Sequence, residues 1–364
     1  MSQLLVNLSV IFSQPTGISN YTLNLFPYLK ELNPILLASQ KYPNFECYPI
    51  PDNLTPAQGS QGHLRRLIWT QFKLPEIYRE LTAKLIFSPL PEAPLYRHCR
   101  YIVQVHDLIP LRFPNLKSPL TNYFRYIVPQ VLAQAQHIIC NSESTAADIV
   151  NFYGIPASKI TPILLAYDAN NFQPNLNPHE SEKNNQEKPY FLYLGRQDKY
   201  KNVGGVIQAF ANLENNQNYE LWLVGPSDKR FAPTLKTQIS ALGITEQVKF
   251  LNYVPYSELP NIIRHAIALV FPSFWEGFGF PVLEAIACGT PVITSNLSSL
   301  PEVTGDAAIL INPYNTAEIT TAMQQMINDE EMRSHFSKLG LERAKKFSWE
   351  KTGLATVEVL TRFI

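Results

Sequence analysis

Two glutamates, Glu276 and Glu284, stand eight positions apart in the stretch FWEGFGFPVLEAIACG, residues 274–289. Gly277 and Gly279 lie between them, and glycines there let the backbone approach a ligand closely. A carboxylate accepts two hydroxyl hydrogens at once, which suits the neighbouring hydroxyls of a sugar or a ribose. The structural alternative is a helix-capping glutamate followed by a solvated one. The glycines between the two carboxylates favour a ligand site.

Basic side chains stand at a second place, in YLGRQDKYKN, residues 193–202. Arg196 offers a planar fork of donors and Lys201 a compact charge, and both suit a diphosphate. A solvated basic pair is the alternative for this stretch taken alone. The sequence therefore supplies separate candidates for the hydroxyls and for the phosphates of one ligand.

Two further candidates lie in the first half of the chain. His106, in VQVHDLIP (103–110), ends an apolar run, from which its ring can hydrogen-bond a substrate hydroxyl. A satisfied structural histidine is the alternative. Gly17, in PTGISNYTLNL (15–25), opens a helical pattern, where a loop can contact phosphate. An ordinary turn explains a lone glycine equally well.

Short apolar runs alternate with helical segments along the whole chain, which predicts an α/β fold with parallel sheets. We expect helices over 18–31, 117–135, 203–213 and 317–328. The expected strands are 4–10, 85–89, 101–107, 137–142, 190–195, 221–225, 248–253, 268–273 and 290–295. Pro281 suits a first helical turn, and Gly289 suits the position after a helix end. The glycine-rich corner between the glutamates is then a loop at the carboxyl end of a parallel strand, where such folds bind ligands.

The polar stretch 170–189, rich in Asn and Pro, indicates a linker between two Rossmann-like domains, 1–169 and 186–348. Lys plus Arg equals Asp plus Glu at 30 each, which argues against nucleic-acid binding. Residues 1–168 hold 13 basic and 10 acidic side chains, so the first half is mildly basic. That excess fits either solvated surface or a face toward an anionic acceptor or a membrane.

The remaining composition predicts a cytoplasmic protein. Four scattered cysteines form no CxxC pair, which argues against a disulfide framework or a zinc site. We expect no signal peptide, because residues 1–20 lack a basic start followed by a long apolar run. No stretch of about 18 apolar residues occurs, so we expect no membrane span. The sequence holds no D-x-D pair for a divalent metal, no P-loop and no GxSxG elbow.

The run PSFWEGFGFPVLEAIACGTPVITSNLSSLPEVTGDAAILINPYN (272–315) resembles the signature of retaining glycosyltransferases of family 4, which have the GT-B fold. VHDLIP, CNSESTAADI (140–149), GRQDKYKN and FSWEKTG (347–353) occur in the same order as in that family. The resemblance implies two facing Rossmann-like domains with parallel sheets. The first would take the acceptor and the second a nucleotide-sugar, and a last helix, from about 349 to 364, would rejoin the first domain.

The resemblance also implies a role for each candidate residue. Arg196 and Lys201 would bind the diphosphate, Glu284 the ribose hydroxyls, and Glu276 the donor sugar. His106 would reach a sugar hydroxyl and counts, with Arg196, Lys201 and Glu276, among the catalytic residues. The remaining donor-binding residues would be Gly17 at the phosphates, Tyr253 and Val254 at the base, and Phe278, Gly279 and Phe280 beside the sugar. Many relatives carry a richer glycine cluster where this chain has only Gly17.

The implied reaction moves a hexose from a nucleoside diphosphate to an acceptor hydroxyl, with retention at the anomeric carbon and with no cofactor or metal. Both UDP-glucose and GDP-mannose enzymes share this signature, and we favour UDP-glucose. The expected acceptor is a growing polysaccharide or a lipid-linked oligosaccharide. The alternatives are a GDP-mannose-dependent mannosyltransferase, a GT-B phosphorylase or epimerase, a non-catalytic sugar-nucleotide-binding subunit, and a glycosidase that uses Glu276 and Glu284.

Overall fold

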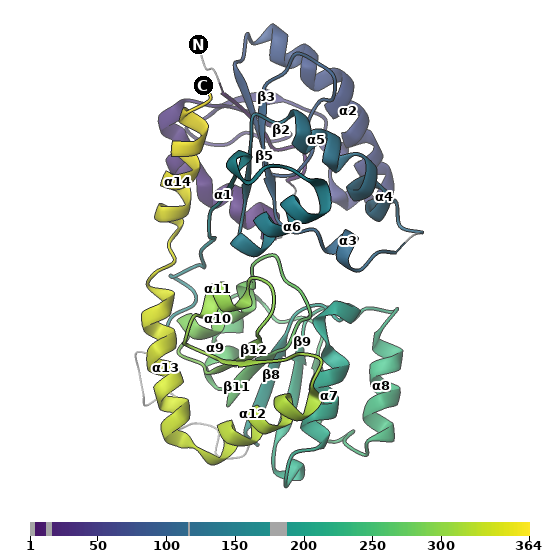
Figure 1. Cartoon of the computed structure of the whole chain (residues 1–364), viewed down its shortest axis with the longest axis vertical. Coiled ribbons are helices and arrows are strands. Elements are labelled where there is room, and N and C mark those ends of the chain that lie inside the picture. Colours follow the sequence, from purple (N-terminus) through teal and green to yellow (C-terminus); the bar gives the residue numbers. More distant parts are fainter. Residues whose placement is uncertain (1–3, 12–16, 116, 175–187) are drawn as a thin grey trace. The chain divides into compact units, whose positions relative to one another are not determined.

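The computed structural model describes residues 4–11, 17–115, 117–174 and 188–364 (Figure 1). The chain forms two compact units, each built on its own sheet. The first unit contains the chain up to Leu165 together with Ser348–Ile364, and the second contains Ala166–Phe347. No helix in the described ranges has the length and apolar character needed to cross a bilayer.

The first unit is built on a 7-stranded sheet in the order β3-β2-β1-β4-β5-β6-β7, and every neighbouring pair is parallel. Its strands are β1 (Leu4–Asn7), β2 (Ile35–Ala38), β3 (Glu46–Pro49), β4 (Leu85–Ser88), β5 (Tyr101–Val105), β6 (His137–Cys140) and β7 (Ile160–Pro162). The central strands are buried along their whole length, because helices cover the sheet. The strand order reverses between β1 and β4.

The helices of the first unit include α14, which follows the whole second unit in sequence. They are α1 (Gly17–Leu29), α2 (Gly59–Glu80), α3 (Ile109–Arg112), α4 (Pro119–Tyr126), α5 (Val128–Gln134), α6 (Glu143–Tyr153) and α14 (Trp349–Thr361). Helix α14 packs along α1, and both lie on the same side of the unit (Figure 1). The two helices approach closely because residue 353 is glycine: a Cβ there would lie 2.1 Å from Cδ2 of Tyr28.

The second unit is built on a 6-stranded parallel sheet in the order β10-β9-β8-β11-β12-β13. Its strands are β8 (Tyr190–Leu194), β9 (Glu220–Val224), β10 (Val248–Leu251), β11 (Ala268–Phe271), β12 (Val292–Ser295) and β13 (Ile309–Ile311). Its helices are α7 (Val203–Ala211), α8 (Ala232–Ala241), α9 (Leu259–Arg264), α10 (Phe280–Ala287), α11 (Leu300–Thr304), α12 (Thr316–Asn328) and α13 (Glu330–Ala344). The strand order reverses between β8 and β11, which is where a fold of this kind opens a crevice for ligands.

The predicted α/β architecture with parallel sheets is confirmed. All nine predicted strands form. Four others in the described ranges, β2, β3, β7 and β13, went unpredicted, and three of these, β3, β7 and β13, are partly exposed and lack a continuous buried run. The single helix predicted over 117–135 is two helices, α4 and α5, which meet at Ile127 with a proline in the first turn of the second. Much of the predicted linker, 175–187, lies outside the described residues, and the second unit already begins at Ala166.

Candidate functional site

The loops that follow β8 and β11 meet at the carboxyl edge of the second sheet. The backbone N–H of Phe274 donates to the carbonyl of Tyr200 at 2.7 Å, which joins the two loops directly. The ammonium of Lys201 lies 5.3 Å from the ring centre of Phe271, the last residue of β11. The strand order therefore brings together two sequence motifs that stand about 75 residues apart, at the point where the order reverses and folds of this kind bind ligands.

Lys201 and Glu276 form a nearly buried ion pair at this edge of the second sheet. The ammonium nitrogen of Lys201 lies 2.7 Å from Oε1 and 2.8 Å from Oε2 of Glu276. Only 14% of the Lys201 side chain and 9% of the Glu276 side chain are exposed. Because an ammonium has three N–H donors, two of them on Glu276 leave one for a further acceptor.

Two serines after β12 fix the backbone around Glu276. The N–H of Glu276 donates to Oγ of Ser298 at 3.1 Å. The hydroxyl of Ser299, which is fully buried, shares its one hydrogen between the carbonyl oxygens of Glu276 at 3.0 Å and Phe278 at 2.7 Å. These bonds satisfy carbonyls that a buried loop would otherwise leave unpaired, so the loop holds a defined shape without secondary structure.

Gly279 is the N-cap residue of α10 and has φ +111°, a conformation that side chains disfavour. A Cβ at this position would also lie 2.7 Å from Cδ2 of Leu300. The N–H groups of Val282 and Leu283 donate to the carbonyl of Gly279 at 3.1 and 3.2 Å. Since Pro281 has no N–H, the donors at this helix start that remain for a ligand are those of Gly279 and Phe280.

Glu284 lies one turn into α10 and has surroundings different from those of Glu276. Its carboxylate is partly buried, and the nearby charge belongs to Asp168, which follows β7 in sequence. Burial of the carboxyl, with a smaller contribution from Asp168, raises the pKa of Glu284 to about 7. The two glutamates therefore have different surroundings: Glu276 pairs with a lysine, and Glu284 lies near a second carboxylate.

Arg196 follows β8 at the same edge of the sheet, and 62% of its side chain is exposed. Its Nε lies 3.0 Å from Oδ2 of Asp198, and Arg230 contacts the same carboxylate at 3.4 Å. The backbone of Arg196 is fixed, because its carbonyl accepts the buried hydroxyl of Tyr193 at 2.6 Å. A fixed backbone with an exposed guanidinium lets the charge turn toward a ligand.

The loop after β10 contains the two residues predicted to meet a base. Tyr253 is 85% exposed and Val254 is partly buried. Tyr256, three residues on, is held by the start of the second unit: its carbonyl accepts the side-chain amide of Asn171 at 3.1 Å, and its ring meets that of Phe172 edge-on at 5.5 Å.

Of the site residues predicted in the first unit, His106 directly follows β5. Its Nε2 lies 2.9 Å from the carbonyl oxygen of Pro89, which directly follows β4. A carbonyl can only accept, so Nε2 carries the hydrogen and Nδ1 is the acceptor. Burial of the imidazole lowers the pKa of His106 to about 4. At neutral pH the ring is uncharged, and its Nδ1 can accept a hydrogen from a hydroxyl.

The rings of Tyr21 and His106 pack edge to face, with centres 5.2 Å apart and planes at 83°. The other predicted residue of this unit, Gly17, is the first residue of α1. The two residues before it in the predicted loop lie outside the described part of the chain. The prediction of a helix that opens at Gly17 is confirmed, and its contact with phosphate stays a prediction.

Sequence reasoning missed four side chains that organise the site. Ser298 and Ser299 stand in the quoted run 272–315 without an assigned role, and Asp168 was given no role either. Asp198 stands two residues after Arg196, a spacing that offered a signal for their pairing. No group of three or more His, Cys, Asp or Glu side chains in the described ranges is arranged to hold a metal ion.

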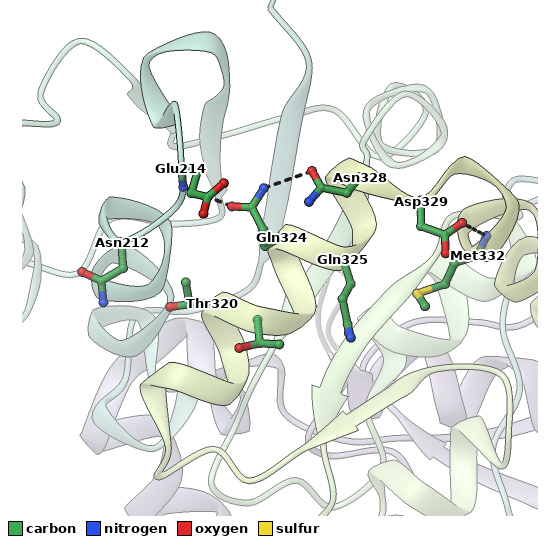
Figure 2. Close-up of a pocket in the computed structure, with 9 residues that line it drawn as sticks. Asn212, Glu214, Thr320, Gln324, Gln325, Asn328, Asp329 and Met332 are labelled. Atoms are coloured by element: carbon green, nitrogen blue, oxygen red, sulfur yellow. Dashed lines mark hydrogen bonds between the residues drawn. The ribbon is translucent and has the colours of Figure 1, made fainter.

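A separate cavity of about 440 Å³ lies between the end of α7 and the helices α12 and α13 (Figure 2). Amides, carboxylates and threonine hydroxyls line it. On α12, Gln324 accepts a hydrogen bond from the Glu214 N–H at 3.1 Å and donates one to Asn328 at 3.2 Å. None of the predicted site residues belongs to this cavity.

Comparison with solved structures supports the fold. The sucrose-phosphate synthase of Thermosynechococcus elongatus has a TM-score of 0.77 at 18% identity, covering 99% of this chain and 98% of that one. HepE of Anabaena, solved with UDP and glucose, has a TM-score of 0.76 at 18% identity, covering 99% and 100%. The fold is accordingly GT-B.

Comparison of sequences identifies the family. The description "Glycosyltransferase Family 4" matches residues 15–170, and "Glycosyl transferases group 1" matches residues 176–343. The O-antigen chain mannosyltransferase B of Escherichia coli is 32% identical over 267 residues, which are 71% of this chain and 69% of that protein. The O-antigen chain mannosyltransferase RfbU of Salmonella typhimurium is 26% identical over 89% of this chain and 90% of its own. The chain belongs to the group 1, family 4 glycosyltransferases.

Proposed function

We propose that this glycosyltransferase moves a hexose from a nucleoside diphosphate to a hydroxyl of a glycan acceptor in polysaccharide synthesis. We favour mannose as the hexose, with glucose as the alternative. The observation that carries the proposal is the meeting of Lys201, Glu276 and the start of α10 at the reversal of the second sheet. This arrangement offers cationic and N–H donors for a diphosphate beside a carboxylate that can accept sugar hydroxyls.

The departing diphosphate is the group whose charge the site must stabilise. Lys201 has one N–H beyond those used on Glu276, and Arg196 is exposed and able to turn inward. The N–H groups of Gly279 and Phe280 add donors that are already fixed in place. Such preorganised groups commonly contribute about 3–4 kcal/mol each to a transition state. The proposed mechanism stabilises the leaving group through this chain's own residues.

Glu276 acts in this proposal by positioning the sugar. Both of its carboxylate oxygens are held by Lys201, an arrangement that lowers the nucleophilicity a covalent intermediate would require. Retention then follows from attack on the same face that the diphosphate leaves, with a phosphate oxygen taking the acceptor's proton. Trapping of a glycosyl adduct on Glu276 in the intact enzyme would contradict this role.

The choice of mannose rests on the sequence relatives. The two compared above are O-antigen mannosyltransferases, whereas the UDP- and glucose-bound HepE is only 18% identical. Our sequence expectation favoured UDP-glucose. The relatives shift the preference toward GDP-mannose, with UDP-glucose as the alternative.

A direct test measures release of nucleoside diphosphate and transfer of radiolabelled sugar from GDP-mannose, UDP-glucose and ADP-glucose to oligosaccharide and lipid-linked acceptors. We expect transfer from GDP-mannose. Thermal shift with each donor is measured in parallel, because binding does not depend on the acceptor. Binding without transfer to any acceptor would favour a non-catalytic sugar-nucleotide-binding subunit, and the absence of both would refute the proposal.

Variants assign the roles within this test. Lys201→Ala should weaken binding of the free nucleoside diphosphate, whereas Glu276→Ala should lower turnover without weakening that binding. His106→Ala should lower turnover with the nucleotide affinity unchanged. An unchanged nucleotide affinity in Lys201→Ala would contradict the assignment of Lys201 to the diphosphate.

A further inference from the structure

Helix α2 leaves an apolar stripe uncovered along the first unit. Leu64, Ile68 and Phe72 follow one another at intervals of four residues, so they lie on one face of the helix. Their side chains are 59%, 53% and 59% exposed. The opposite face of α2 is buried in the core, for example through Leu74 and Ile77. Single exposed apolar residues are ordinary, but a continuous row of them indicates an interaction surface.

A second segment extends this stripe. Tyr96 is 78% exposed, yet its position is fixed: its hydroxyl donates to Gln130 at 2.8 Å and its N–H to Gln134 at 2.9 Å. Between this segment and the second half of α2 lies a groove of about 370 Å³, with the rings of Phe72 and Tyr96 among its walls. Fixed, outward aromatic rings are suited to contact with another surface.

The charges around the stripe are mainly positive. Arg65 and Arg79 are exposed on α2, and the guanidinium of Arg97 lies 5.9 Å from the ring centre of Phe72. On the groove, Glu76 already pairs with Lys73 at 2.8 Å. Glu80, at the end of the helix, accepts a hydrogen bond from Tyr48 at 3.3 Å. Three arginines therefore surround the apolar row without acidic residues in equal number.

We infer that this surface, the α2 face of Leu64, Ile68, Phe72 and Tyr96 with Arg65, Arg79 and Arg97, docks on an anionic lipid bilayer. A helix with an apolar row and flanking arginines buries the row at the boundary between headgroups and acyl chains. Each arginine gains from the negative surface potential. A second copy of the chain is the poorer partner, because a symmetric contact would bring the same arginines together. The inference concerns the first unit alone and does not rest on the proposed donor.

The test is co-sedimentation of the full chain with vesicles of phosphatidylcholine, alone or mixed with phosphatidylglycerol. We expect binding to the mixed vesicles and little to the neutral ones. The double variant Ile68→Glu, Phe72→Glu should bind the mixed vesicles at least about tenfold more weakly, because it places negative charge in the apolar row. Arg79→Ala with Arg97→Ala should bind several-fold less, and the difference should shrink at high salt. Leu354→Glu is the matched control, since this leucine of α14 is 51% exposed in the same unit.

Three results would overturn the inference. One is a wild-type chain that stays in the supernatant with phosphatidylglycerol vesicles. Another is an equal loss of binding in Leu354→Glu. The third is a wild-type dimer that the Ile68 and Phe72 changes convert to a monomer, which would assign the face to self-association. Circular dichroism and nucleotide affinity, measured for every variant, separate these results from misfolding and from failure of the proposed donor site.

Discussion

The ion pair between Lys201 and Glu276 gives the sharpest test of the site. The pair is nearly buried, and the ammonium nitrogen lies 2.7 and 2.8 Å from the two carboxylate oxygens. At an effective dielectric constant of about 20, the attraction across such a distance is roughly 6 kcal/mol. Desolvation of two ions cancels much of this gain, so the pair itself adds little to stability. Removing one partner, however, leaves the other charge buried without compensation.

We therefore expect Lys201→Met and Glu276→Gln each to lower the free energy of unfolding by about 3–5 kcal/mol. The double variant should lose less than either single one, because neither charge remains. For a unit of this size, about 2–4 °C per kcal/mol places the single-variant transitions on the order of 10 °C below wild type. Calorimetry of the full chain gives these shifts, and Glu246→Gln, at an exposed position of the second unit, is the control.

The affinity of the same variants for the free nucleoside diphosphate is a second test, because a pair with a purely structural role would not change that affinity. Glu276→Gln releases the positive charge of Lys201, so the free nucleoside diphosphate should bind several-fold more tightly than to wild type. Lys201→Met should bind it more weakly. The reasoning fails if the two losses of stability add in the double variant within about 0.5 kcal/mol, or if Glu276→Gln weakens nucleotide binding as much as Lys201→Met does.

Three further predictions concern single positions. Burial raises the pKa of Glu284 to about 7, above the value of roughly 4.3 in an unfolded chain. Ionisation of Glu284 therefore lowers the stability of the folded chain as the pH rises from about 4.3 to 7. Glu284→Gln should raise the unfolding temperature at pH 8 and leave it unchanged near pH 4. The phosphates of a sugar nucleotide do not titrate between pH 6 and pH 8. A sugar nucleotide should therefore bind wild type more tightly at pH 8 than at pH 6, and a binding titration of Glu284→Gln should show no such rise in affinity. Gly279→Ala, at φ +111°, should cost about 1–3 kcal/mol and weaken nucleotide binding by titration. Gly353→Ala would place a Cβ 2.1 Å from the Tyr28 ring, so calorimetry should show a free energy of unfolding about 1–3 kcal/mol lower than wild type. Its nucleotide affinity should be unchanged, and a loss of affinity would contradict a purely structural role for Gly353.

The local structure around Glu284 was predictable because its signals are local. A proline in the first turn and a glycine after the end define a short helix, and α10 runs from Phe280 to Ala287 with Pro281 in its first turn and Gly289 at φ +78° beyond its end. Apolar runs likewise predicted the buried strands. Short strands such as β3, whose residues are half or fully exposed, lack that pattern and were missed.

The contacts of the site were not predictable, because they depend on the order of strands in the sheet. The family resemblance implied that the loops after β8 and β11 bind one donor, but the residue types alone do not place the loops side by side. The direct pairing of Lys201 with Glu276 appears only in the fold. The same holds for the hydrogen bonds of Ser299 and for the proximity of Asp168 to Glu284. Residue types predicted which groups act, and topology determines which of them meet.

The path of the chain through its two units has a consequence for synthesis. The second unit is one continuous segment, whereas the first needs Ser348–Ile364 to cover α1. On the ribosome, domains generally complete their folding in order from the N-terminus. Here the second unit can complete its folding first, while the α1 surface of the first unit is still uncovered. Until α14 is made, that surface stays exposed on the nascent chain and open to a chaperone.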